Sequence, residues 1–454
     1  MMASFPDRKV NELRFKLQSL PNELKSWRDQ SAANQALEKN HSQISRLAFR
    51  VEGLHGKVIS EFKDLEKNGK LLLFADSLER KALAVHMVWD FFRSKFALRE
   101  VGAFAPYLAL ADAFTRECYV EPFRKMKNLP TGELCPAPLV TFDNEISPWA
   151  KPQNLSKPDP QEGGFLTPQQ FNDALKQLPV ALLGLPWSFL SYLPHMSLLA
   201  HEVGHAIERD CDLESTLDLA ANNMPLSDEG HRAAWQTWRK EVFADLYGAL
   251  MAGPAFVWSL ADYLAKDEQS ITAENRPHSN QSWTQYPTTS LRILLLCRFL
   301  ESHNFAADAA SIRSQWKTDY PEHSLPGFEK DFDSVIDALA SAARFADLSG
   351  LAFPTPVAPA MTSPERRIAG LYSRDIELRD NEPQPARAYV AAARLLMDQQ
   401  TVRPLEEVWR KLAQHHLRSR PPFVAGENLQ QPVIEEDRER AAGAEVADIL
   451  FRDL

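Results

Sequence analysis

Residues 198–207 read Leu-Leu-Ala-His-Glu-Val-Gly-His-Ala-Ile, and the interpretation of the whole chain starts from them. Apolar residues surround the motif in a pattern that is compatible with a helix. On a helix, residues four positions apart lie on one face, so His201 and His205 can direct their imidazoles at a single metal ion. Glu202 lies about 100° further round the helix, where it can reach a water molecule beside that ion. The stretch therefore predicts a helix that carries two metal ligands and a base.

A catalytic zinc ion usually takes three protein ligands, so the two histidines need a partner elsewhere in the chain. In metzincins that partner is a histidine that follows a glycine shortly after the motif, but this sequence has Glu208 and Cys211 at those positions. Another candidate is Glu241, which lies 241 − 205 = 36 positions after the second histidine. Asp245 follows four positions later, on the same face if the segment is helical.

The pattern His201-Glu202-x-x-His205 with Glu241-x-x-x-Asp245 resembles the gluzincin metallopeptidases. The chain lacks the Gly-x-Met-Glu-Asn run of the large zinc aminopeptidases, so the resemblance is to a clan and not to one enzyme. It implies that His201, His205 and Glu241 bind Zn²⁺. It also implies that Asp245 accepts the second ring N–H of a ligand histidine and that Glu202 is the general base.

Gluzincins also place a hydrogen-bond donor beyond the glutamate ligand, where it stabilises the developing oxyanion. In this chain the resemblance offers His278, Tyr286 and Arg292 for that role. The segment from Tyr286 to Arg292 opens an apolar helix that can bring either residue to the cleft. Each of the three is, by itself, equally typical of a turn or a surface position. Of these candidates, Tyr286 is the one that we predict as an additional catalytic residue.

The composition describes an ordinary globular protein. Hydrophobic residues make up 44% and charged residues 25% of 454 residues, enough for two or three domains. The net charge of −10 argues against general nucleic-acid binding. The four cysteines are widely spaced, and the N-terminal residues lack an apolar signal core. These features predict reduced thiols in a cytoplasmic protein.

Residues 178–200 contain no charged side chain of the Lys, Arg, Asp or Glu type and are long enough to cross a bilayer. However, Pro179, Pro186 and Pro194 interrupt the stretch, and proline breaks helices. We therefore expect no membrane span. The stretch is better explained by a buried strand at 180–185, a loop and the start of the metal-binding helix.

The sequence predicts a mainly α fold with a small β-sheet (α+β), in which a zincin-like core at 131–270 lies between helical regions at 1–130 and 271–454. Apolar residues between 44 and 65 recur at three- and four-residue steps. They favour a helical bundle, with a coiled-coil arm for oligomerisation or partner binding as the alternative.

Two segments, 136–142 and 180–185, are strand candidates, and Ser147 to Thr167 is predicted to be a loop rich in proline, glycine and polar residues. By analogy with zincins, either strand could pair with an extended peptide substrate.

Together these features predict an intracellular zinc-dependent peptidase that carries out limited proteolysis of a peptide or protein substrate. Whether it cuts inside a chain or trims ends stays open, because no residue in the sequence decides it. The alternative is a non-catalytic, metal-containing regulatory or scaffold protein that acts through its helical arms. An intact Glu202 favours the enzyme, because a purely structural metal site does not need a base.

Overall fold

The computed structural model describes residues 4–32, 37–129, 137–143, 148–151, 167–175, 177–274, 283–321, 325–354, 363–419 and 436–452. The α-helices are α1 (Phe5–Gln30), α2 (His41–Lys67), α3 (Ala75–Ala97), α4 (Ala105–Met126), α5 (Pro168–Leu175), α6 (Leu199–Asp210), α7 (Glu214–Asn222), α8 (Glu229–Leu264), α9 (Glu268–Ala273), α10 (Thr289–Ser302), α11 (Ala306–Asp319), α12 (Phe332–Ala342), α13 (Pro364–Tyr372), α14 (Ala386–Leu395), α15 (Leu405–Arg418) and α16 (Glu436–Leu450). The strands are β1 (Leu139–Asp143), β2 (Trp149–Lys151) and β3 (Leu182–Pro186). The predicted class, mainly α with a small sheet, is confirmed.

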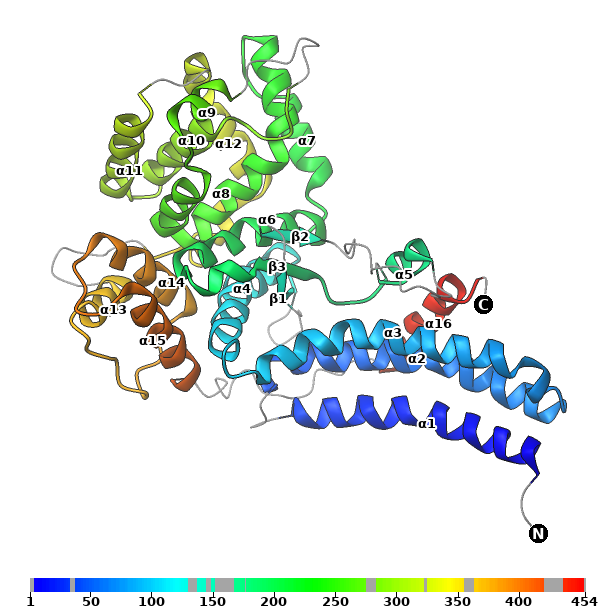
Figure 1. The fold of residues 1–454 in the computed structure, drawn as a ribbon. Helices are drawn as coiled ribbons and strands as arrows, with labels where there is room; N and C mark the ends of the chain where they lie inside the picture. The colour runs from blue at the N-terminus through cyan, green and yellow to red at the C-terminus, as the bar shows by residue number, and fades with distance from the viewer. Residues whose placement is uncertain are drawn as a thin grey trace.

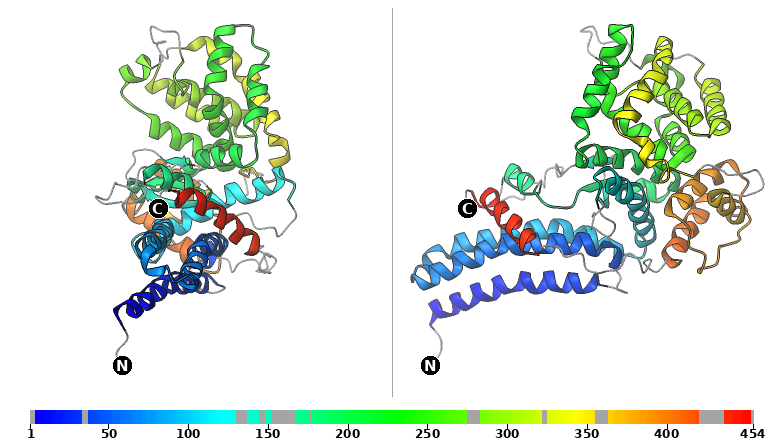
Figure 2. Two further views of the ribbon diagram at one scale, coloured as in Figure 1. Left: turned by 90° about the vertical axis from the view of Figure 1, so that its right-hand side faces the viewer. Right: turned by 180° about the vertical axis from the view of Figure 1, so that it is seen from behind.

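Three long helices, α1, α2 and α3, run side by side and project away from the remaining helices (Figure 1), as the two rotated views also show (Figure 2). We call these helices, with the C-terminal helix α16, the arm. Helix α16 crosses α2 at backbone distance. A Cβ atom on Gly53 would lie 1.9 Å from the carbonyl oxygen of Arg440, and one on Gly443 would lie 1.9 Å from that of Arg50. Glycine at both positions is therefore what allows the two ends of the chain to pack together.

The sheet has the strand order β1-β3-β2. Strand β3 pairs in parallel with β1, with Leu139 opposite Leu182, and antiparallel with β2, with Trp149 opposite Gly184. Because β3 is paired along both edges, it cannot accept a peptide strand, and that part of the substrate-binding expectation is wrong. β2 was not predicted, since the whole of Ser147 to Thr167 was expected to be a loop. Three residues are too few to show an alternating pattern.

Helix α8 runs through the second part of the molecule and contacts α6, α7, α10, α12 and α14. Gly253 (φ 60°) divides it at a bend, and helical structure continues beyond Pro254 to Leu264. The side chain of Phe353 occupies the space where a Cβ on Gly253 would lie. Helix α8 is long and apolar enough to cross a bilayer, but 83% of its most apolar stretch is buried inside the protein. That burial is typical of a core helix.

Two separate hydrophobic cores fill the structure. One belongs to the arm and also includes α5, and the other, which we call the central core, extends from α4 to α15. The predicted boundaries at 130 and 270 do not separate these cores, because α4 packs in the central core and α16 returns to the arm. Helices are assigned to a core by their apolar faces and not by their order along the chain.

The cysteines that the structure describes, Cys118, Cys211 and Cys297, lie outside any disulfide, and Cys135 lies outside the described residues. Residues 178–200 form β3, two 3₁₀ turns and the start of α6, in keeping with the prolines that interrupt them.

Candidate metal centre

Helices α6 and α8 approach each other closely at Gly204. A Cβ atom on this glycine would lie 3.0 Å from the Cα atom and 3.2 Å from the carbonyl oxygen of Ala244. The glycine therefore brings the two helices together between the two histidines of the motif. Gly248, one turn after Ala244 on α8, does not take part in this approach. Gly248 faces the ring of Phe256, which the bend at Gly253 folds back against it.

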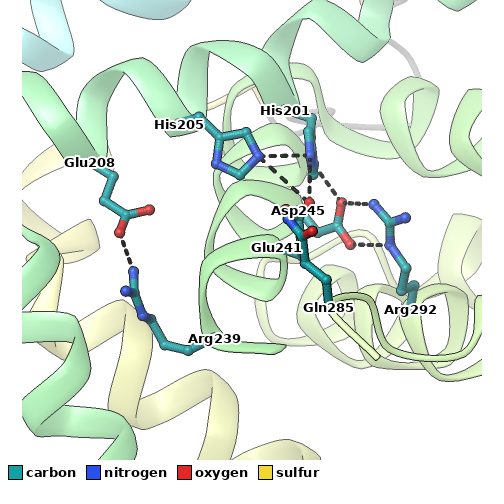
Figure 3. Close-up of polar contacts among 8 residues, drawn as sticks. All are labelled: His201, His205, Glu208, Arg239, Glu241, Asp245, Gln285 and Arg292. Atoms are coloured by element: carbon teal, nitrogen blue, oxygen red, sulfur yellow. Dashed lines mark hydrogen bonds and ion pairs between the residues drawn. The ribbon is translucent and has the colours of Figure 1, made fainter. Parts of the chain in front are cut away.

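The close approach of the helices gathers three side chains, as Figure 3 shows. The Nε2 atoms of His201 and His205 lie 3.2 Å apart. Glu241 Oε2 lies 3.3 Å from Nε2 of His201 and 3.6 Å from Nε2 of His205. A tetrahedral zinc ion with bonds of about 2.0–2.1 Å holds its ligand atoms about 3.3 Å apart. The three residues thus form a group that could hold a metal ion, and its dimensions suit one tetrahedral ion.

Asp245 and Arg292 lie behind His201. Asp245 Oδ1 is 2.8 Å from Nδ1 of His201, so Nε2 is left to face the other ligands. The guanidinium of Arg292 donates two hydrogen bonds to the Asp245 carboxylate, at 2.7 and 2.8 Å. Arg292 is 8% exposed, and its guanidinium also lies 5.7 Å from the centre of the Tyr286 ring. It holds Asp245 behind His201 and does not belong to the described lining of the cleft.

The electrostatics of the group follow from these contacts. Burial acts to lower the pKa of His201, but its hydrogen bonds with Asp245 and Glu241 outweigh burial and raise the pKa to about 10. For Glu241, burial is opposed by hydrogen bonds with both histidines, which hold its pKa well below the usual range. For Asp245, burial is outweighed by Arg292, and the pKa is again lowered. The metal-free site is therefore a network of ionised groups.

An open cleft of about 740 Å³ lies in front of the three residues. Glu202, 9% exposed, lies in its wall, and Tyr286, 48% exposed, and Gln285 also line it. Burial and the charge of Glu241 raise the pKa of Tyr286, so its hydroxyl keeps its proton at neutral pH. His278 lies outside the described residues.

Two residues of the cleft were missed from the sequence. Gln285 donates a hydrogen bond of 3.3 Å to Oε1 of Glu241, and nothing but its position next to Tyr286 could have suggested this. Glu208 was considered only as a residue that fails to match a glycine. It is 3% exposed in the wall of the cleft and forms an ion pair with Arg239 (Figure 3). Its spacing of seven positions from His201, two helical turns, could have placed it on this face.

Comparison with known protein families, with curated proteins and with solved structures finds no match for the chain. The function of the site has therefore to be inferred from its own geometry and chemistry.

Proposed function

We propose that the protein is a zinc-dependent peptidase of the gluzincin type, in which His201, His205 and Glu241 hold the metal ion. The observation that carries this proposal is the triangle of donor atoms, with sides of 3.2, 3.3 and 3.6 Å, at the wall of an open cleft. Two imidazoles and a carboxylate suit zinc, and three protein ligands leave a fourth position for water or substrate.

The fit of a cation is supported by the state of Glu241. Its Oε2 atom is buried, and the polar atoms that face it in the described residues are Nε2 of His201 and Nε2 of His205, at 3.3 and 3.6 Å. Two imidazole nitrogens and a carboxylate oxygen that turn toward one point are a donor set that suits a divalent cation. A divalent ion at the centre of the triangle would bind all three.

Zinc held at this site would supply Lewis-acid polarisation of a peptide carbonyl and an acidified water. Glu202 takes a proton from the attacking water and delivers it to the leaving nitrogen. Tyr286 donates its hydroxyl hydrogen bond to the carbonyl oxygen as negative charge develops there. Asp245, held by Arg292, fixes the proton of His201 on Nδ1, so that Nε2 is available to the metal.

A second candidate function is a metal-containing regulatory or scaffold protein, in which the site stabilises the central core and the helical arm binds a partner. The arm supports this alternative, because it has its own hydrophobic core and contributes no residue to the described lining of the cleft. We propose the peptidase first, acting inside the cell on a peptide or protein substrate, because Glu202 lies in the open cleft next to the triangle.

The decisive experiment compares the native protein with Glu202→Gln on a fluorogenic peptide library, with zinc content measured for both. Loss of the base should lower kcat by about 10²–10⁴-fold while zinc content stays the same. Glu12→Gln, the same change at an exposed position of α1, is the control and should leave turnover unaltered. Equal turnover by the native protein and Glu202→Gln, with zinc bound, would reject the peptidase and favour the scaffold.

A further inference from the structure

Glu208 has a buried carboxylate that its surroundings only half satisfy. It lies on α6 one turn after His205, in the wall of the cleft, with its side chain 4% exposed. One oxygen, Oε1, forms the ion pair with Arg239. The other, Oε2, is buried and has no hydrogen-bond partner in the part of the chain that the structure describes. In Figure 3 one arm of the carboxylate points to Arg239 and the other points away from it, to the side where His205 and Glu241 lie.

The charge around Glu208 is also incompletely balanced. Arg239 is 6% exposed and shares its guanidinium between Glu208 and Asp218, whose Oδ1 lies 2.6 Å from Nη2 of the arginine. Two carboxylates and one guanidinium leave one negative charge. The Asp218 side chain is 53% exposed, so water solvates that end of the group. The negative charge that remains unbalanced therefore lies at the buried end of this group of three side chains, where Glu208 borders the cleft.

The position of Glu208 relates it to the substrate. Glu208 follows His205 by three positions, which corresponds to a rise of about 4.5 Å along the axis of α6. An extended peptide advances about 3.3 Å per residue, so Glu208 lies one to two substrate residues from a bond held at the triangle.

The described lining of the cleft continues the same charge beyond Glu208, with exposed Asp212 and Glu214. Apart from the three residues of the triangle, it holds four carboxylates (Glu202, Glu208, Asp212 and Glu214) and two cationic side chains (Arg209 and Lys240), and Asp212 is paired with Lys127 at 2.5 Å. Arg209 is already paired with Asp210, at 2.7 Å.

We propose that Glu208 forms a subsite for a positively charged nitrogen of the substrate, and this inference rests on the proposed function. A neutral N–H group could donate a hydrogen bond to Oε2 of Glu208, but it would not balance the negative charge of the carboxylate. A cationic donor supplies both the missing hydrogen bond and the missing charge, and hydrogen bonds between ionised groups are the stronger ones. Two sources provide this chemistry, namely a lysine or arginine side chain near the scissile bond and the free α-amine of a peptide.

The test measures binding without turnover, in zinc-loaded Glu202→Gln, by calorimetric titration. One set of hexapeptides is acetylated and amidated and carries a single lysine at each position in turn along an alanine background. A second set carries norleucine in place of lysine. A third is the alanine peptide with a free or an acetylated N-terminus. We expect lysine at one position, or the free amine, to bind at least about tenfold more tightly than its neutral counterpart.

Two further variants in the same background assign this preference to Glu208. Glu208→Gln should reduce it to less than about threefold, because the amide keeps the shape but not the charge. Asp218→Asn is the matched control, since Asp218 contacts the same arginine without belonging to the described lining of the cleft. It should leave the preference unchanged. Where Glu208→Gln fails to fold, Glu208→Asp replaces it and should weaken the preference, because the shorter side chain withdraws the charge.

The source of the cation follows from which peptides show the preference. A preference confined to the free N-terminus assigns the α-amine, and one that depends on the position of lysine assigns a side chain. Equal binding of cationic and neutral peptides, absence of binding by every peptide, or a preference that survives Glu208→Gln or Glu208→Asp would each overturn the subsite. These titrations measure binding and not hydrolysis, so their failure is distinct from failure of the proposed function. If the native protein cuts peptides but the preference for a cation is absent, the subsite is refuted and the proposed function stands.

Discussion

The central core and the arm bury ion pairs to different extents. In the central core, Asp245 and Arg292 are 1% and 8% exposed and hold each other and His201 in a single network. In the arm, the side chains of Glu52 and Arg440 form an ion pair that remains 17% and 38% exposed, over a core of apolar side chains. Ions cost several kcal/mol to bury unless they are well paired. The arm also buries one carboxylate, Glu439, 7% exposed, but its partners Arg46 and Arg50 stay 28% and 19% exposed and keep contact with water. The Asp245-Arg292 network has both ions buried, and that calls for a functional explanation.

The largest difference between the regions should appear when one arginine is removed from each. Arg292→Gln leaves Asp245 buried with His201 as its remaining cationic partner and should lower the free energy of unfolding by about 3 kcal/mol. Arg440→Gln should cost less than about 1 kcal/mol, because Glu52 keeps Arg28 at 3.0 Å and the pair is partly hydrated. Urea unfolding of the metal-free proteins measures both.

Zinc affinity separates a functional network from a merely structural one. Arg292→Gln should weaken zinc binding by about 10–100-fold, since Asp245 then holds His201 less firmly, whereas Arg440→Gln should not change it. Similar losses of stability in the two variants, or equal zinc affinities, would mean that the buried network has no special relation to the metal site.

The sequence predicted most of the helices, since their apolar residues recur at helical spacing. It also identified the three residues of the triangle, because residues four positions apart on one helix lie on the same face and this spacing can be read from the sequence. It missed Gln285, and it did not reveal that Arg292 pairs with Asp245. Those positions depend on how separate segments pack, which no spacing within one helix encodes. The return of α16 to α2 was missed for the same reason, although Gly53 was visible as a weak point in a helical pattern.

Substitution of one glycine in each region tests how closely the helices pack there. Gly204→Ala places a Cβ atom 3.0 Å from the Cα of Ala244, on a helix held in place by buried charged groups, whereas Gly56 on α2 has nothing within 4 Å. We expect Gly204→Ala to lower the free energy of unfolding by about 1–3 kcal/mol and to weaken zinc binding, because α6 and α8 must move apart. Gly56→Ala should raise it by about 0.5–1 kcal/mol through helix propensity alone. If Gly204→Ala were as stabilising as Gly56→Ala, the close approach of α6 and α8 would not be a constraint on the site.

The smallest expected effect is a dependence on pH, and it differs in sign between one histidine of the central core and one of the arm. The pKa of His201 is raised from 6.5 to about 10, so its stabilising charge in the metal-free protein is complete below pH 6.5 and lost as pH rises toward 10. Burial lowers the pKa of His55, whose ring contacts the carbonyl oxygen of Leu17 at 2.7 Å. The stability that the neutral form of His55 contributes is present above pH 6.5 and lost as pH falls.

Zinc must displace the proton of His201, so its affinity should rise about tenfold per pH unit between pH 7 and pH 9. Competition with a chromophoric chelator, corrected for the protonation of the chelator, measures this slope. His55→Gln should leave the slope unchanged, since the arm exchanges no proton with the metal site. A flat profile would mean that His201 is already neutral in the metal-free protein, and the hydrogen bonds that it donates to Asp245 and Glu241 would then be too weak to overcome burial.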